Sequence, residues 1–563
     1  MASTQETDLK DILEFVNESR GWFLTDLCEI KPSPIGGLCI FAKQKIPTDT
    51  TLLRLHKSCI FSSSNSSIAN LLLDSEVDGL LALNIAFIYE ITVFKDRSHW
   101  VPYLKSIRVC NSDGSLMLPP AYWNSAAREL LRYTTVDTLY DGLRPQEEIR
   151  EGYEVARGLA KRWNREFGLE IPTEYLDCEG DREETFLKFV AVAFAISSRV
   201  FEIDAFHESA LVPIADLFNH HVDTPDIRFV SLYDVCDLCG EAGECKHVQM
   251  EELGLVQRLS ANKKGIEEEQ QESLNGEISY ELIRDLEREQ QLQREEEGEE
   301  EEGKSDGGED GGEDLLDPEE CVEMVSVHDI RAGEEIFNSY GELSNSLLLM
   351  RYGFAAPENP WDVVDLGRDV LRLVRKTKQY TKRAKWWSTI GYDMYSNWVH
   401  QFRATSDEEE DDDDDEDENG SLDGYDSDRQ GKLDTQSEGE GEDSGPWLSG
   451  LELDCNGDAS PSMWALLNIL SMKEPEWKKF LRKVTEDADS STKVEGLLLR
   501  LEQRNNPNAK KLLLDLINSK RLPKLPEKLD SKKLGIGRNL VDSVVTLIKG
   551  ELSIISRARK SLS

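Results

Sequence analysis

The stretch "VPIADLFNHHVDTPD" (212–226) concentrates residue types that can bind metals or polar ligands. It contains Asp216 and Asn219, followed by the adjacent histidines His220 and His221. Neighbouring side chains usually point in different directions, and a two-histidine metal site on a helix usually has i, i+4 spacing. The stretch is therefore a poor candidate for a metal site. The alternative is a turn whose Asn and Asp side chains bind backbone groups.

A second cluster, "CDLCGEAGECKH", brings four soft ligands into twelve residues. The ligands are Cys236, Cys239, Cys245 and His247. Three thiolates and an imidazole suit tetrahedral zinc, with a structural rather than a catalytic role. A loop of free thiols within an insert is the alternative interpretation.

Other signatures of catalysis are missing from the sequence. There is no Gly-x-Ser-x-Gly nucleophile elbow. The Gly cluster at 535–537 opens a helical pattern without a preceding strand, and the cluster at 439–445 lies in an acidic tract. Neither arrangement fits a phosphate-binding loop, so a Rossmann-type enzyme is disfavoured.

The segment "IRAGEEIFNSYGELSNSLLLMRYGF" (330–354) places two tyrosines at the ends of expected elements. A short strand should end at Tyr340, and a helix capped by Ser344 or Asn345 should end at Tyr352. Side chains at element ends can face a pocket. Two core tyrosines are the alternative.

The elements that must position these residues alternate between β and α patterns. We expect a helix at 8–24 and a hairpin at 38–60, the latter because "LCIFAKQKIPTDTTLLRLH" alternates around a Pro-Asp turn. Further strands are expected at 211–214, 227–233, 322–327 and 335–339. Helices are expected at 68–95, 120–132, 146–168, 182–198, 366–404, 461–484, 493–504, 507–518 and 536–559. A β-rich unit is thus interrupted by a long helical insertion.

The formal net charge of −45 comes mainly from two acidic inserts. Residues 266–320 hold 24 acidic and 4 basic residues, and residues 406–443 hold 20 acidic and 2 basic residues. Both inserts are expected to be disordered, because they cannot bury enough apolar surface. Nucleic-acid binding is disfavoured, since phosphate neutralisation needs a basic face. A basic protein partner is expected instead.

The N-terminus "MASTQETDLKDILEF" has no secretory pattern, and the longest apolar stretch (79–94) is short and contains Asn84 and Glu90. We therefore expect a protein of the nucleus or cytoplasm that does not bind membranes. We also expect a monomer.

The two C-terminal motifs together resemble a known family. "ADLFNHH" and "GEEIFNSYGELSNSLLLMRYGF" resemble the paired signatures of the SET-domain methyltransferases, in particular the branch of the Rubisco large-subunit lysine methyltransferase. "SPIGGLCIFAKQKI", "SHWVPYL" (98–104) and "SSRVF" (197–201) are similar to further elements of that branch. The resemblance covers residues 20–360 well and 361–563 more weakly.

The resemblance implies an α+β fold, in which a β-rich SET domain with a pseudoknot is split by a helical insertion and followed by an all-α C-terminal domain. The expected parts are an N-terminal helix (1–25), SET residues 26–67, the insertion 68–195, SET residues 196–356 and a substrate-binding-like domain 357–563. The acidic inserts fall at about 260–320 and about 405–445.

The resemblance also implies roles for individual residues. Tyr340 would be the catalytic tyrosine. Cofactor contacts would come from Ile35, Gly36, Gly37, Arg199, Asn219, His220 and Tyr340, and substrate contacts from Arg199, Asp216 and Tyr352. Ile35 stands where the family usually has the first glycine of Gly-x-Gly. Phe229 and Tyr233 are candidates for a further aromatic wall of the lysine channel.

The implied activity is S-adenosyl-L-methionine-dependent protein-lysine N-methylation of a non-histone or basic protein. Two alternatives remain open from the sequence. One is a protein-histidine N-methyltransferase, and the other is a catalytically weak SET scaffold that binds basic partners through its acidic inserts.

Overall fold

The computed structural model describes residues 2–34, 36–111, 113–139, 142–177, 182–232, 235–241, 245–248, 320–407, 445–486 and 491–563. Most of both acidic inserts lies outside these ranges. The contacts divide the chain into a first unit, Met1–Met117 with Glu147–Ser339, and a second unit, Leu118–Gln146 with Tyr340–Ser563. The sequence pattern assigns 118–146 to the helical insertion, whereas the contacts group these residues with the C-terminal helices.

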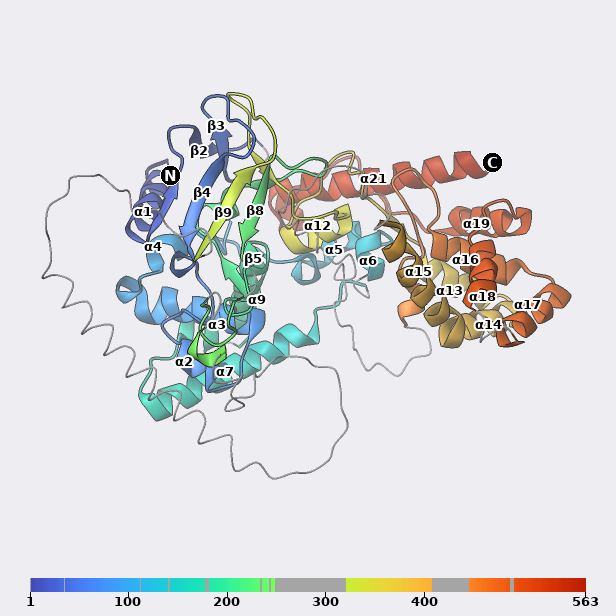
Figure 1. Ribbon diagram of the computed structural model, residues 1–563, viewed down its shortest axis with the longest axis horizontal. Coiled ribbons are helices and arrows are strands. Elements are labelled where there is room, and N and C mark those ends of the chain that lie inside the picture. The colour runs from blue at the N-terminus through green and yellow to red at the C-terminus, as the bar shows by residue number, and fades with distance from the viewer. Residues whose placement is uncertain are drawn as a thin grey trace, which may run out of the picture. The chain divides into compact units, whose positions relative to one another are not determined.

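The first unit is built on an antiparallel sheet of four strands in the order β1-β4-β9-β8. Its strands are β1 (Gly21–Phe23), β4 (Thr51–His56), β9 (Cys321–Ser326) and β8 (Ile227–Ser231). Leu52, Leu53 and Leu55 of β4 are buried, so this strand lies within the core. Figure 1 shows β4, β9 and β8 side by side, although about ninety residues separate β8 from β9 in the sequence.

The predicted hairpin at 38–60 is wrong, although both of its strands exist. β3 (Leu38–Ala42) pairs with β2 (Cys28–Pro32), and β4 pairs with β1 and β9. The connection between β3 and β4 bonds elsewhere: the backbone N–H of Ala42 donates to Glu334 and that of Ile46 donates to Ile330, each at 2.9 Å. Alternation in a sequence identifies strands, but it does not identify their partners.

The N-terminal helix is shifted from its expected place. Helix α1 spans Ala2–Glu18, and the residues after it turn into β1. Arg20 has a left-handed backbone (φ 56°), which ends the helical path. A Cβ at Gly21 would lie 2.6 Å from the Leu55 side chain, so glycine permits the close approach of β1 to β4.

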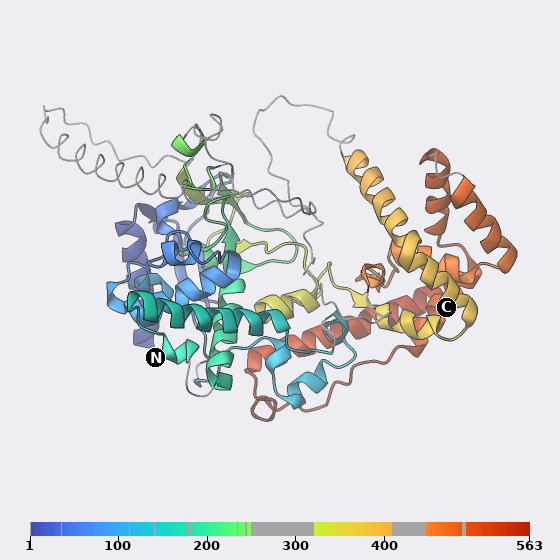
Figure 2. The ribbon, with the colours of Figure 1, turned by 90° about the horizontal axis from the view of Figure 1, so that it is seen from below.

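The helical insertion packs around α3 (Gly79–Tyr89), whose residues from Ala82 to Tyr89 are all buried. A helix that is apolar on every side must lie inside the protein. It is followed by a π-helical turn (Glu90–Phe94), η3 (Lys95–Arg97) and α4 (Val101–Leu104). The other helices are η1 (Lys57–Cys59), α2 (Ala69–Leu73), α7 (Glu147–Phe167), α8 (Thr173–Leu176) and α9 (Arg182–Ser197). Figure 2 shows the long helix α7 in turquoise beside the other helices of this group. Across the described residues, no helix combines the length and the apolar character that a membrane span requires.

A small hairpin links the insertion to the second half of the β-rich part. β5 (Val200–Glu202) pairs with β6 (Ser209–Leu211), and Asp204 lies in the turn between them. The Asp204 carboxylate accepts hydrogen bonds from His207 Nδ1 at 2.9 Å and forms a buried ion pair with Lys57 Nζ at 2.8 Å. Lys57 also donates to the Leu232 carbonyl at 2.7 Å, so one ammonium joins this turn to the end of β8.

In the described part of the second unit the regular elements are helices, apart from the antiparallel pair β11 (Val364–Asp365) and β12 (Glu452–Leu453). One core joins α5, α6, α12, α20 and α21, and another joins α13 to α19. The helices are η4 (Pro120–Tyr122), α5 (Ser125–Leu130), α6 (Thr135–Leu139), α12 (Asn345–Tyr352), α13 (Gly367–Val374), α14 (Lys378–Trp386), a π-helical turn (Trp387–Gly391), α15 (Tyr392–Asp407), η9 (Pro446–Leu448), α16 (Pro461–Ser471), α17 (Glu474–Glu486), α18 (Ser491–Leu501), α19 (Pro507–Ser519), α20 (Ser531–Leu534) and α21 (Arg538–Leu562).

We predict that Asp204→Asn destabilises the protein by roughly 3–5 kcal/mol, because it leaves the Lys57 ammonium buried without its counter-charge. Burial by itself raises the pKa of Asp204, but the hydrogen bonds and charges of His207 and Lys57 outweigh it and lower the pKa to about 2 from 3.8. The stabilisation is therefore present above pH about 4 and is lost as the pH falls towards 2. Urea unfolding at pH 7 measures the effect.

The matched control is Asp329→Asn, which removes the partner of the exposed Lys45. Water and salt screen an exposed pair, so the unfolding midpoint should barely change. Equal losses of stability for the two variants would contradict the proposed role of the buried pair.

Candidate active site

Two short strands bring the central motifs together. β7 (Asn219–His220) runs parallel to β10 (Phe337–Asn338), with Asn219 beside Phe337 and His220 beside Asn338. The backbone N–H of His221 donates to the Asn338 carbonyl at 2.9 Å. Asn-His and the segment before Tyr340 are thus adjacent in space, as the pseudoknot of the resemblance implies.

Glu335 connects the Asn-His strand to the glycine turn. Asn219 Nδ2 donates to Glu335 Oε1 at 2.7 Å, and Ser33 Oγ donates to the same carboxylate at 2.9 Å. The backbone N–H of Ser33 donates to the Gly37 carbonyl at 3.0 Å, which closes the turn. Glu335 was not among the site residues predicted from the sequence. The available signal was its position just before the strand that pairs with Asn219.

The glycine turn has the backbone freedom that a cofactor loop needs. Gly36 and Gly37 have φ values of 145° and 71°, a region that favours glycine. A Cβ placed on Gly37 would meet no atom within 4 Å, because this glycine is exposed. Ile35, the residue at the family's first glycine position, lies outside the described residues.

Asp216 is held by two side chains from different elements. Arg199 Nη1 lies 3.2 Å from Asp216 Oδ2, and the Tyr103 hydroxyl donates to the same oxygen at 3.3 Å. The Asp216 side chain is only 3% exposed, and among the described residues no group donates to its Oδ1. Burial raises the pKa of Asp216, while the Arg199 charge and the Tyr103 hydrogen bond oppose the shift. Tyr103, which lies in the quoted "SHWVPYL", was not predicted as a site residue.

The backbone before Asp216 is strained. Ile214 is buried and has φ 68°, a conformation that is unusual for a β-branched residue. Such a residue persists only where its surroundings fix it, and strain of this kind is concentrated at functional sites. The 3-10 turn η5 (Ala215–Leu217) follows directly and carries Asp216.

His220 is uncharged at neutral pH. Burial, aided by the charge of His221, lowers the pKa of His220 to about 4. Burial raises the pKa of the neighbouring Cys39 thiol to about 12, so this cysteine is also neutral. The site around β7 therefore presents neutral groups beside the Glu335 carboxylate.

Tyr340 and Tyr352 belong to the second unit and lie against each other. Their ring centroids are 4.7 Å apart, and the ring of Phe354 lies 6.5 Å from that of Tyr340. Helix α12 between them is capped by Ser344, whose hydroxyl accepts from the backbone N–H of Leu347, and ends at Gly353 in a left-handed conformation. The predicted cap and the placement of both tyrosines beside the ends of elements are confirmed.

The other predicted residues of the first unit lie apart from Glu335 in their contacts, or outside the described residues. Phe229 is half-buried, and its ring lies 4.9 Å from that of Phe201, while Tyr233 lies outside the described residues. His221 packs against Phe337 with ring centroids 5.4 Å apart. Within the described ranges, the one group of potential metal ligands is Cys236, Cys239, Cys245 and His247, and it does not include the 212–226 stretch.

The chain is similar over its whole length to a characterised enzyme. It is 44% identical over 588 residues to ribosomal lysine N-methyltransferase 3 of Saccharomyces cerevisiae (strain ATCC 204508 / S288c), covering 100% of both chains. Shorter matches are 49% identity over 49 residues with N-lysine methyltransferase setd6 of Salmo salar (8% of this chain, 11% of that protein) and 44% over 48 residues with ribosomal lysine N-methyltransferase set10 of Schizosaccharomyces pombe (8% and 9%).

A solved structure of the SET domain of LSMT bound to lysine and AdoHcy aligns with 99% of this chain and 90% of its own, with a TM-score of 0.47 and 13% identity. No family model matches the chain. The full-length relative decides the assignment. The chain belongs to the SET-domain protein-lysine N-methyltransferases, which use S-adenosyl-L-methionine as methyl donor.

Proposed function

We propose that this enzyme methylates lysine side chains of ribosomal proteins. The observation that carries the proposal is the 44% identity, along the whole of both chains, with a ribosomal lysine N-methyltransferase. Ribosomal proteins are generally basic, which agrees with the acidic inserts of this chain. A ribosomal substrate also agrees with the expected location in the nucleus or cytoplasm.

We assign the cofactor-binding face to the glycine turn and β7. The exposed backbone of Gly37 and the hydrogen bonds of Ser33 and Asn219 to Glu335 support this assignment. Neutral His220 would add no positive charge to this face. S-adenosyl-L-methionine would supply an activated methyl group here, and Ile35, Gly36 and Gly37 would contact its methionine and ribose parts.

The substrate amine must be neutral to accept a methyl group. Desolvation and a nearby positive charge both lower the pKa of a lysine, so a dry channel favours the reactive form. We assign Asp216 and Arg199 to the wall of this channel. Asp216 Oδ1 is a buried acceptor that can receive a hydrogen bond from the entering lysine, and Arg199 fixes the carboxylate through Oδ2.

We assign the catalytic role to Tyr340, with Tyr352 as a second aromatic wall. Methyl transfer is an in-line displacement, so alignment of the amine with the methyl group is the main requirement. Good alignment can lower the barrier by several kcal/mol, up to roughly 7–11 kcal/mol. The Tyr340 hydroxyl would position the amine and stabilise the transferring methyl group.

The function is tested by incubating the enzyme with a labelled methyl donor and ribosomal proteins from a strain that lacks it. We expect label on lysine of a ribosomal protein, identified by mass spectrometry. Tyr340→Phe should bind the cofactor normally and lose turnover by on the order of 10²-fold, as expected when one pre-positioned polar group is removed from the reacting centre.

The matched control is Tyr380→Phe on α14, which should retain full turnover. Label on histidine would establish the alternative activity instead, and absence of label from ribosomal proteins would reject the proposed substrate. Unchanged turnover of Tyr340→Phe would reject the role of that residue alone.

We predict that Glu335→Gln weakens cofactor binding about tenfold, equivalent to about 1.4 kcal/mol. Ser33 and Asn219 both donate to Glu335 Oε1, and Ser33 Oγ also lies 2.9 Å from Oε2. An amide removes the negative charge that strengthens these bonds and replaces one carboxylate oxygen by a donor NH2 group. Isothermal titration calorimetry with S-adenosyl-L-methionine measures the change. Glu334→Gln alters the neighbouring, exposed carboxylate and should bind as the wild type does. Similar affinities for the two variants would contradict the bridging role.

We predict that the acidic insert at about 405–445 raises the local concentration of basic substrates. Replacing its acidic residues by Ser at unchanged length should raise KM for a ribosomal protein at low salt. The difference should shrink at high salt, where charges are screened. KM for a short peptide with little net charge serves as the control, because it should not change. An equal rise for peptide and protein would argue against electrostatic capture.

A further inference from the structure

The Cys/His segment after β8 gathers four metal-ligating atoms at one point. One ligand atom from each of Cys236, Cys239, Cys245 and His247 lies within 4.8 Å of the other three. His247 Nδ1 is 3.8 Å from Cys236 Sγ and 3.9 Å from Cys245 Sγ. Around a tetrahedral Zn²⁺, bonds of about 2.3 Å to sulfur and about 2.0 Å to nitrogen place ligand atoms roughly 3.5–3.8 Å apart. We propose that these four residues bind one structural zinc ion.

The backbone of the first two ligands forms a tight turn that presents both sulfurs. The N–H of Gly240 donates to the Cys236 carbonyl at 2.8 Å, and the N–H of Cys236 donates to the Glu241 carbonyl at 3.0 Å. Gly240 has φ 72°, and a Cβ there would lie 2.7 Å from the Phe206 ring. Glycine directly after Cys239 therefore permits both the turn and its contact with Phe206.

The segment has little else to hold it together. From Val235 to Val248, the described residues form no helix longer than three residues, and only Val235, Cys236 and Cys245 are buried. A stretch without its own apolar core usually needs a disulfide or a metal to be ordered. None of the three cysteines forms a disulfide, and their sulfurs lie at the mutual spacing of metal ligands.

The ligand set selects the kind of metal and its role. Thiolates with an imidazole favour zinc over magnesium or calcium, which prefer oxygen ligands. Three sulfurs and one nitrogen complete a tetrahedron and leave no position for water or substrate, so the site is structural rather than catalytic. Binding by three thiols and a neutral imidazole releases up to three protons and leaves a net charge of −1 at the site.

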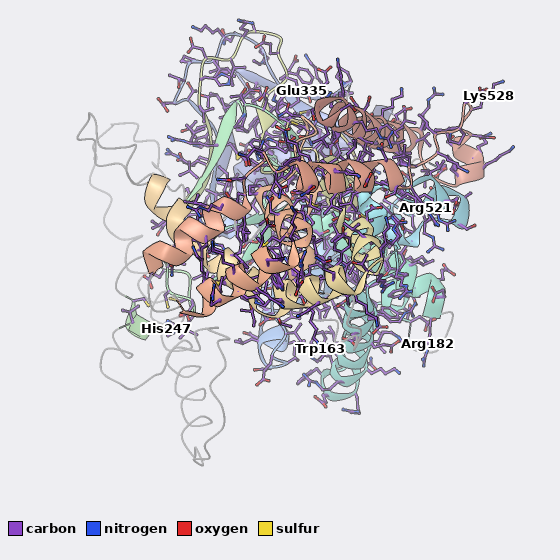
Figure 3. All side chains as sticks on the ribbon, turned by 90° about the vertical axis from the view of Figure 1, so that its right-hand side faces the viewer. Trp163, Arg182, His247, Glu335, Arg521 and Lys528 are labelled. Carbon is purple, nitrogen blue, oxygen red and sulfur yellow. The ribbon has the colours of Figure 1, made fainter. Side chains whose placement is uncertain are left out.

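The site lies where the chain leaves the sheet for the acidic insert. His247 is on the short helix just before that insert (Figure 3). Gly240 rests on Phe206 of the β5–β6 turn, and Ser231 Oγ at the end of β8 donates to the Ile203 carbonyl at 3.0 Å. The zinc ion would therefore hold together the start of the long β8–β9 connection, and Gly240 of this segment contacts Phe206 of the hairpin between Arg199 and Asp216.

The test is the metal content of the full-length protein, purified after growth with added zinc and measured by plasma mass spectrometry. We expect one zinc per chain in the wild type and in Cys110→Ser, whose half-buried cysteine lies outside the cluster. Cys239→Ser should lose the zinc. No metal in the wild type, iron in place of zinc, or full retention of zinc in Cys239→Ser would each overturn the proposal.

A second measurement does not depend on a variant that might fail to fold. In the wild-type protein, Cys236, Cys239 and Cys245 should resist alkylation until a chelator removes the metal, and mass spectrometry of the peptides identifies each site. Replacement of zinc by Co²⁺ should give the absorption bands of a tetrahedral thiolate complex. Alkylation of all three cysteines at the same rate with and without chelator would contradict zinc binding.

Discussion

The site depends on the parallel pairing of β7 with β10, in which two residues of one strand pair with two residues of the other. β7 and β10 join Asn219–His220 to Phe337–Asn338, across more than a hundred residues of intervening sequence. This register places Glu335 beside Asn219 and delivers the chain to Tyr340 two residues later. A shift of one residue would turn every side chain of β10 to its other face. The short pair therefore fixes which carboxylate meets the glycine turn.

Two buried aspartates, Asp204 and Asp216, differ in their hydrogen-bond partners and in the direction of their pKa shifts. Asp204 is paired with both Lys57 and His207, and its pKa is lowered to about 2. In Asp216 only Oδ2 accepts hydrogen bonds from Arg199 and Tyr103, and burial raises the pKa of this carboxyl group. A fully paired carboxylate stabilises the fold, whereas one with a vacant, buried acceptor is suited to receive a ligand. Both lie within twenty residues of chain, on either side of β6.

Local sequence patterns predicted the elements better than their partners. The buried helix α3, the Ser344 cap and the strands around 227 and 322 are present as expected. The prediction of a hairpin at 38–60 was wrong because the segment between its strands forms backbone hydrogen bonds to residues 330–334. No local pattern in the sequence reveals these distant partners. The resemblance located Asn219 and Tyr340 by motif. Glu335 and Tyr103 were not predicted, because each acts through a hydrogen bond to a residue far away in the sequence. The bonds to Asn219 and Asp216 span 116 and 113 residues.

The β7–β10 pair also sets the order of events during synthesis. Residue 338 is made 118 residues after residue 220, an interval of roughly 6–24 s at the usual rate of elongation. Throughout that time the Asn-His strand has no partner on the growing chain, and the helices of the insertion can already pack. Lengthening the acidic insert adds little to the closure entropy, about 0.6 kcal/mol per doubling of the loop. A longer insert would instead delay the pairing of β7 with β10. The edge of the Asn-His strand would then stay unpaired for longer on the ribosome.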